Sequence, residues 1–236
     1  MPSRRLLVVI PTYNERDNLE ELFTGIRQYL PDADIQIVDD ASPDGTAEWA
    51  EELGKRLGRV SVRRRPGKLG IGSAYRDAFR EGLIQGYERL VSMDGDLSHE
   101  PQYLPALVEK TESADVAIGS RYMHGISVLN WDLHRLALSV GGNAYTRLVT
   151  GLPIKDCTSG FQCFRREVLE RVDVGRLRSN GYGFLVELKF LAHRLGFRLA
   201  EVPIVFVDRR FGASKNGVAT IFKSMWTVST LPFWRH

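Results

Sequence analysis

The stretch RRLLVVIPTYNERDNLEELF, residues 4–23, contains an apolar run, a polar turn and the start of an amphipathic pattern, in that order. The run that ends at Ile10 shows no alternation with polar residues, which is typical of a strand buried on both faces of a sheet. After the turn, apolar residues recur at helical spacing, at Leu19, Leu22, Phe23, Ile26 and Leu30. A buried strand followed by a one-sided helix is the repeating unit of an α/β sheet.

The same pattern continues through the first half of the chain. Strand-like runs occupy residues 34–40, 60–65, 88–94 and 114–122, and helical patterns occupy residues 45–58, 73–86 and 101–112. This alternation predicts a Rossmann-like α/β fold, with a mostly parallel sheet flanked by helices on both faces. The second half is less regular, with helices expected over 131–149 and 184–196, a strand and short helix over 160–172, and a strand over 199–209. We expect one compact domain over 1–216, followed by a C-terminal amphipathic segment over 217–236.

The composition is that of an ordinary globular protein. The 236 residues are 43% hydrophobic and 26% charged, and the net charge of +3 gives no indication of nucleic-acid binding. No stretch reaches the roughly 20 apolar residues that span a bilayer, and the LLVVI run is too short for a signal peptide. Cys157 and Cys163 lack the spacing of a zinc site, which favours two reduced core thiols in a cytoplasmic protein.

Three polar clusters follow the first, second and fourth expected strands: residues 11–15 (PTYNE), 39–46 (DDASPDGT) and 93–98 (MDGDLS). Each alone is explained by turn formers or helix caps. Because ligands bind beyond the carboxyl ends of strands in such sheets, the three together predict one functional cleft. Its expected acidic lining is Glu15, Asp39, Asp40, Asp94 and Asp96.

The chemistry of the expected cleft follows from its carboxylates. Asp94 and Asp96 flank Gly95, so the main chain can direct both carboxylates to one point. Mg²⁺ and Mn²⁺ favour such oxygen ligands together with substrate phosphates. Asp39 and Asp40 are alternatively placed to hydrogen-bond a base or ribose. The glycine-rich residues 67–75 match neither a phosphate loop nor a dinucleotide fingerprint, which favours a loop with close helix packing.

Five segments together resemble the family-two glycosyltransferases with a GT-A fold, and more narrowly the dolichol-phosphate (polyprenol-phosphate) mannosyltransferases. They are VVIPTYNERDNL, IVDDASPDGT, KLGIGSAY, MDGDLSHEP and VDRRFGASK, and they extend from about Leu6 to Lys215. Gly95 stands where relatives have alanine, and Ser98 where some have a glutamine that joins the metal ligands. Ser98 is therefore an uncertain ligand.

The resemblance implies a role for each matching residue. Donor-nucleotide contacts are expected from Pro11, Tyr13, Glu15, Val38, Asp40, Asp94, Gly95, Asp96, Arg209 and Lys215. Of these, Asp94 and Asp96 would hold Mg²⁺ or Mn²⁺ on the diphosphate, which Arg209 and Lys215 would also reach. The acceptor phosphate would be held by Arg121, Arg135 and Ser139. Asp94, Asp96, Arg121, Arg209 and Lys215 form the expected catalytic set.

The implied activity is metal-dependent, inverting transfer of mannose from GDP-mannose to a dolichyl or polyprenyl monophosphate. A phosphate monoester is largely a dianion at neutral pH, so this nucleophile needs no general base. The alternatives are UDP-glucose or another donor, a polysaccharide acceptor, or a non-catalytic subunit that binds nucleotide sugars. The expected location is the cytoplasmic face of a membrane, with a possible anchoring partner protein. The apolar spacing in 217–236 indicates either an interfacial helix or an ordinary packed one.

Overall fold

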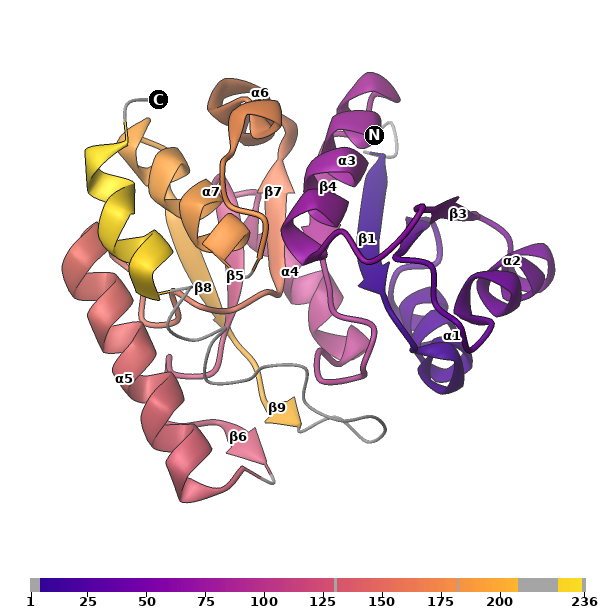
Figure 1. Cartoon of the computed structure of the whole chain (residues 1–236), viewed down its shortest axis with the longest axis horizontal. Coiled ribbons are helices and arrows are strands. Elements are labelled where there is room, and N and C mark those ends of the chain that lie inside the picture. Colours follow the sequence, from indigo (N-terminus) through magenta and orange to yellow (C-terminus); the bar gives the residue numbers. More distant parts are fainter. Residues whose placement is uncertain (1–4, 130, 182, 208–224, 235–236) are drawn as a thin grey trace.

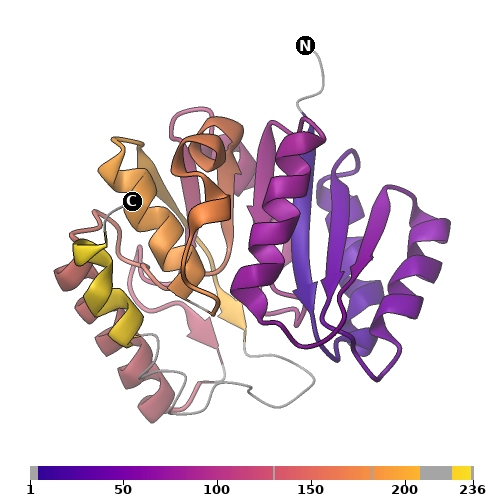
Figure 2. The same cartoon turned by 45° about the horizontal axis from the view of Figure 1, so that its top comes forward.

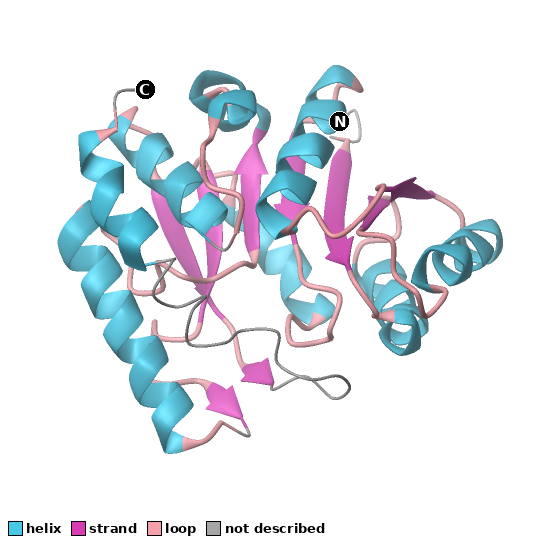
Figure 3. Cartoon of the chain, in the orientation of Figure 1, coloured by secondary structure: helices cyan, strands magenta, loops and turns pink. Residues whose placement is uncertain are grey.

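The computed structural model describes residues 5–129, 131–181, 183–207 and 225–234. Its described strands form a seven-stranded sheet in the order β3-β2-β1-β4-β7-β5-β8 (Figures 1 and 3). The strands are β1 Leu6–Thr12, β2 Asp34–Asp39, β3 Val60–Arg64, β4 Arg89–Ser92, β5 Val116–Ser120, β7 Gln162–Arg165 and β8 Leu199–Pro203. All neighbouring pairs are parallel except those of β7, which runs antiparallel to both β4 and β5. The mostly parallel sheet expected from the sequence is confirmed.

Helices cover both faces of this sheet (Figure 2). The α-helices are α1 Leu19–Tyr29, α2 Thr46–Leu57, α3 Ile71–Ile84, α4 Leu104–Lys110, α5 Leu133–Thr150, α6 Arg166–Val172 and α7 Gly183–Arg194. Alternate residues of β1 divide the core between the two faces. Leu7 and Val9 belong to the cluster that includes α3, α6 and α7, whereas Val8 and Ile10 belong to the cluster that includes α1, α2 and α4. This two-sided burial explains why the β1 sequence is continuously apolar.

Short elements complete the described chain. Single 3-10 turns occur at η1 Arg16–Asn18, η2 Pro101–Tyr103, η3 Val174–Arg176 and η4 Leu231–Phe233. Beyond the carboxyl edge of the large sheet, β6 Val128–Leu129 pairs in parallel with β9 Phe206–Val207 (Figure 1). Residues 225–230 are helical and lie beside α5, where the hydroxyl groups of Tyr145 and Ser229 form a hydrogen bond. Across the residues described, none of the helices is both long and apolar enough to cross a bilayer.

Candidate active site

The three polar clusters lie on loops at one edge of the sheet, because β2, β1 and β4 are adjacent and parallel. The β2 and β4 ends are bonded directly to β1: the Asp40 N–H donates to the Thr12 carbonyl at 3.1 Å, and the Met93 N–H donates to the Val9 carbonyl at 3.1 Å. A methyl group added to Gly95 would lie 3.5 Å from Cγ of Glu15, which is ordinary contact. The loop therefore has room for an alanine at this position.

Asp39 joins the first and second clusters. Its buried carboxylate accepts hydrogen bonds from the Thr12 hydroxyl at 3.0 Å and from the Ser42 N–H at 2.8 Å. The carboxylate thus has partners on the loops after both β1 and β2. Its observed contacts are those of a turn former that aligns the two loops.

Asp40 has a different set of partners, from the loop that follows β3. One of its oxygens lies 2.6 Å from Nη1 of the buried Arg65, and the other accepts the Gly70 N–H at 3.0 Å. These bonds hold the glycine-rich loop against the β1 and β2 ends. In that loop Lys68 places Nζ 4.2 Å from the centre of the Tyr13 ring, which is a cation–π contact.

Close helix packing, expected for the glycine-rich loop, is confirmed at Gly72. A methyl group there would lie 2.7 Å from the main-chain carbon of Asn180, and the Gly72 N–H donates to the Asn180 carbonyl at 3.0 Å. Only a residue without a side chain allows this approach. The expected nucleoside contacts Pro11 and Val38 are cross-strand neighbours in β1 and β2. Because the Val38 side chain is buried, a ligand contact from Val38 would come from its main chain.

The loop after β4 holds its two acids in different environments. The side chain of Asp94 is 30% exposed, whereas Asp96 is buried. The Ser98 hydroxyl and N–H both donate to Oδ1 of Asp96, at 2.5 and 3.2 Å. Ser98 therefore positions Asp96, because its two donors hold one carboxylate oxygen in the loop.

His99 has a packing role in the same loop. Its Nδ1 accepts the Asp94 N–H at 3.0 Å. The ring stacks on Phe161 with centroids 4.8 Å apart and meets the edge of Phe206 at 5.6 Å. The imidazole is buried between these rings and is not available as a general base.

The pair Asp94 and Asp96 fits a hard divalent cation and does not fit zinc. Within the described ranges, no three side chains of histidine, cysteine, aspartate and glutamate converge on a common point. Mg²⁺ is commonly held by one or two carboxylates and completed by substrate phosphates and water. The donor set therefore suits a cation that binds together with a phosphorylated ligand.

Arg121, at the end of β5, is held by Asp156. Its Nε and Nη2 donate to the two Asp156 oxygens, both at 2.7 Å, and Nη2 also donates to Thr158 at 2.9 Å. Burial alone would lower the pKa of Arg121, but the charge and hydrogen bonds of Asp156 outweigh it and raise this pKa. Arg121 is therefore always charged, and no described residue bonds to its Nη1.

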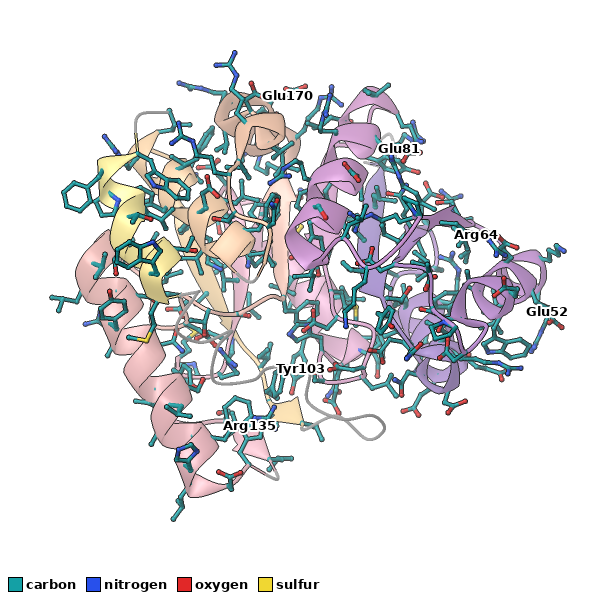
Figure 4. All side chains as sticks on the ribbon, viewed as in Figure 1. Glu52, Arg64, Glu81, Tyr103, Arg135 and Glu170 are labelled. Atoms are coloured by element: carbon teal, nitrogen blue, oxygen red, sulfur yellow. The ribbon has the colours of Figure 1, made fainter. Side chains whose placement is uncertain are left out.

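The acceptor residues expected from the sequence are brought together by two aromatic rings. Trp131 lies between two guanidinium groups, 5.7 Å from that of Arg121 and 4.4 Å from that of Arg135. The Tyr122 hydroxyl donates to the Ser139 hydroxyl at 2.8 Å, which connects the loop after β5 to α5. Figure 4 shows Arg135 extending from α5 beside the β6–β9 pair. Two arginines and a serine hydroxyl form a fitting group for a phosphate.

Two of the expected diphosphate contacts, Arg209 and Lys215, lie outside the described residues, as do residues 217–224 of the C-terminal segment. Sequence reasoning missed Asp156, Lys68 and Trp131. Asp156 gave no local signal, because a single acid before a cysteine is unremarkable. The roles of Lys68 and Trp131 depend on contacts with a ring and with guanidinium groups that only the fold brings beside them.

Comparison with known proteins agrees with this geometry. Residues 7–173 match the family model described as Glycosyl transferase family 2. The chain is 44% identical over 225 residues to the undecaprenyl-phosphate mannosyltransferase of Micrococcus luteus, covering 95% of this chain and 93% of that protein. It is also 44% identical over 230 residues to the polyprenol monophosphomannose synthase of Mycolicibacterium smegmatis, covering 97% of this chain and 87% of that protein.

Two solved structures show the same fold at lower identity. Glucosyl-3-phosphoglycerate synthase from Mycobacterium tuberculosis, with Mn²⁺, uridine diphosphate and glucosyl-3-phosphoglycerate, gives a TM-score of 0.67 at 19% identity, covering 98% of this chain and 79% of that one. A mannosyltransferase from Pyrobaculum calidifontis, with GDP-mannose and Mn²⁺, gives 0.61 at 17% identity, covering 98% and 70%. The expected GT-A architecture is confirmed, and use of a metal is typical of this fold.

Proposed function

The chain belongs to glycosyl transferase family 2 and is a glycosyltransferase, and from that premise we propose that it transfers mannose from GDP-mannose to a polyprenyl or dolichyl monophosphate. The observation that carries the proposal is the presence of two separate groups suited to phosphate at one edge of the sheet. Asp94 and Asp96 suit a metal-bound diphosphate, and Arg121, Arg135 and Ser139 suit a phosphate that binds directly. The names of the two 44% identical relatives support the sugar and the lipid class.

The donor half of the proposed site consists of the loops after β1, β2 and β4. Tyr13, Glu15 and Asp40 would contact the nucleoside, with Lys68 covering Tyr13 from the glycine-rich loop. Asp94 and Asp96 would hold Mg²⁺ or Mn²⁺, which when bound stabilises the negative charge that develops on the departing diphosphate. Arg209 and Lys215, outside the described residues, are proposed to contact the same diphosphate.

In the acceptor half, an oxygen of the lipid phosphate attacks the anomeric carbon of mannose. The bond from that carbon to the donor diphosphate breaks, and the electron pair leaves with GDP, so the configuration inverts. The phosphate dianion has no proton to lose at neutral pH, so the step requires no base. Arg121 and Arg135 would hold this dianion in line with the bond that breaks. They would lower the barrier by positioning the nucleophile and by supplying fixed positive charge.

Replacement of Arg135 by alanine is expected to raise the KM for the lipid phosphate by roughly tenfold or more, which corresponds to loss of one charge-assisted hydrogen bond. GDP affinity, measured by calorimetry, should change less than twofold. Arg147→Ala is the matched control, because Arg147 is exposed on the same helix. Arg209→Ala should weaken GDP binding instead. Equal losses of GDP affinity in the Arg135 and Arg209 variants would reject the division into acceptor and donor contacts.

The acceptor's hydrocarbon tail implies docking on a bilayer, and α5 offers an apolar exposed face for it. Residues exposed along one stripe of α5 are Leu133, Ala137, Val140, Gly141, Ala144 and Leu148.

In the neighbouring C-terminal segment, Trp226 is 74% and Phe233 is 83% exposed, while Val228 and Leu231 are buried in the core. Tryptophan is favoured at membrane interfaces, and α5 also carries Arg135 and Ser139. We therefore place the lipid bilayer against this face, with the protein peripheral on the cytoplasmic side.

Introducing glutamate at both Trp226 and Phe233 is expected to reduce co-sedimentation with vesicles that contain anionic lipid by about tenfold or more, because charge is excluded from the interface. Point substitutions are preferred to truncation, since removal of residues 217–236 would also remove the buried Val228 and Leu231. Ile84→Glu is the control, because Ile84 is 85% exposed at the end of α3. Equal vesicle binding by wild type and the double variant would show that this segment is not the membrane contact.

A further inference from the structure

Lys189 is a lysine in the interior of the molecule. It lies in α7, within the run FLVELKFLAHR, and its exposed fraction is 0%. Its Nζ donates to the main-chain carbonyl of Ser159 at 3.0 Å. Lysine is almost never fully buried without a partner, because removing its charge from water is costly. A neutral carbonyl alone does not offset that cost, so the surroundings of this lysine need a further explanation.

The segment that Lys189 contacts, residues 156–160, joins the two halves of the proposed site. At its start, Asp156 forms the bidentate pair with Arg121. At its end, the Gly160 carbonyl accepts the Ser92 hydroxyl at 2.7 Å, and a methyl group on Gly160 would lie 3.7 Å from the Asp94 carboxylate. The Ser159 carbonyl therefore lies between the group that holds Arg121 and the wall beside Asp94.

We propose that Lys189 is a positioning residue for the acceptor phosphate, which holds the 156–160 segment in place and keeps the Arg121 region positive. This inference rests on the proposed function, since the anion in question is the lipid phosphate. Its geometric basis is the bond from Lys189 to the Ser159 carbonyl, in the segment that begins with Asp156, the partner of Arg121.

Three buried ionisable groups meet at this place: Arg121, Asp156 and Lys189. Arg121 and Asp156 together are neutral, and a neutral pair offers little attraction to a phosphate dianion. The charge of Lys189 leaves the three groups with a net charge of +1. The thiol of Cys157 also faces Lys189, but burial raises the pKa of that thiol to about 11, so it remains neutral. Lys189 thus adds one positive charge behind Arg121 without touching the substrate, and this charge counters the negative charge of Asp94, which also acts on Arg121.

A change of pH can remove the positive charge of Lys189 while its hydrogen bond to Ser159 remains. Burial lowers the pKa of Lys189 to about 8; the negative charge of Asp156 opposes this shift and the positive charge of Arg121 adds to it. Above that pH the amine loses its charge, yet a neutral amine still donates to the Ser159 carbonyl. In the unfolded chain this lysine keeps its proton up to about pH 10.4. Loss of the proton from the folded protein alone therefore raises the free energy of unfolding as pH rises from 8 to 10. A fall in phosphate affinity over the same range is therefore not a sign of unfolding caused by this group.

The test measures the Kd of the full chain for a short-chain prenyl phosphate by calorimetry at pH 7.0, 8.0 and 9.5. We expect the wild-type Kd to rise about tenfold over this range, a change of roughly 1.4 kcal/mol. Lys189→Met should show a raised Kd at pH 7.0 and no further rise, while its GDP affinity stays within twofold of wild type. Lys155→Met is the control, because the exposed Lys155 immediately precedes the segment and likewise donates to a main-chain carbonyl, that of Met123, at 2.9 Å.

A wild-type Kd that is independent of pH would overturn the inference, and this measurement needs no variant to fold. A Lys189→Met variant that keeps the wild-type pH dependence would also overturn it. If the wild type bound no prenyl phosphate at any pH, both the inference and the acceptor assignment would fall. Mannose transfer with a pH-independent Kd would overturn the role of Lys189 alone.

Discussion

Alanine at Asp94 or at Asp96 is expected to lower the rate of sugar transfer by at least about two orders of magnitude, the scale of removing one key charge-stabilising group. The two carboxylates flank Gly95 at the carboxyl end of β4, and Ser98 fixes the orientation of Asp96. In the proposed site, loss of either acid would remove one of the two carboxylates that hold the cation. The departing diphosphate would then lack its main source of positive charge.

Initial rates at saturating donor and acceptor measure this effect, with Glu52→Ala as control. Glu52 is an exposed acid on α2, far from the β4 loop (Figure 4), so its removal changes the net charge equally without touching the site. Addition of Mg²⁺ or Mn²⁺ to metal-free protein should restore activity to wild type and not to the Asp94 and Asp96 variants. Near-normal turnover in excess chelator would contradict the assignment of both acids.

The second large effect is expected on stability, from Asp156→Ala. This substitution leaves the buried charge of Arg121 without its partner and also removes the compensation for Lys189. Breaking a buried pair by removing one partner typically costs about 3–5 kcal/mol of unfolding free energy. Urea denaturation at pH 7 measures it, with Glu20→Ala as control, because Glu20 forms an exposed ion pair with Arg56 at 3.1 Å. A loss below about 1 kcal/mol would contradict the structural importance of this pair.

The same pair has a defined pH dependence. Burial alone would raise the pKa of Asp156, but the charge and hydrogen bonds of Arg121 outweigh burial and lower it. A carboxylate with a lowered pKa contributes its stability fully above the unfolded value of about 3.9, and that contribution is lost as pH falls through the folded value. Asp156→Ala should therefore approach the wild type in stability only under strongly acidic conditions.

Much of the fold followed from local sequence patterns, and the exceptions have a physical reason. The apolar runs at β1, β2 and β4 required burial on both faces, which implies parallel strands whose carboxyl ends share an edge. The convergence of the acidic loops was therefore predictable. The antiparallel insertion of β7 between β4 and β5 was not, because four residues of Gln162–Arg165 contain no information on their distant partners.

The same distinction applies to individual side chains. Asp94 and Asp96 were identifiable because their spacing is itself the chemical signal. Asp39 was expected to line the cleft, but its carboxylate is occupied by Thr12 and Ser42. Asp156 and Lys189 were not predicted, because their roles depend on partners that are distant in the sequence. Asp156 bonds to Arg121 after β5, and Lys189 in α7 bonds to Ser159. Long-range ion pairs of this kind leave no periodic or local pattern in the chain.

The central proposal is tested most directly by incubating the full chain with GDP-mannose, Mg²⁺ or Mn²⁺ and a polyprenyl phosphate, and measuring hexose in the lipid product by mass spectrometry. Parallel reactions contain UDP-glucose, or an unphosphorylated polyprenol of the same length. We expect a mannosyl lipid phosphate with GDP-mannose and none with the polyprenol, because Arg121 and Arg135 are proposed to bind the acceptor through its anionic phosphate. Glucosyl product from UDP-glucose, with no product from GDP-mannose, would contradict it.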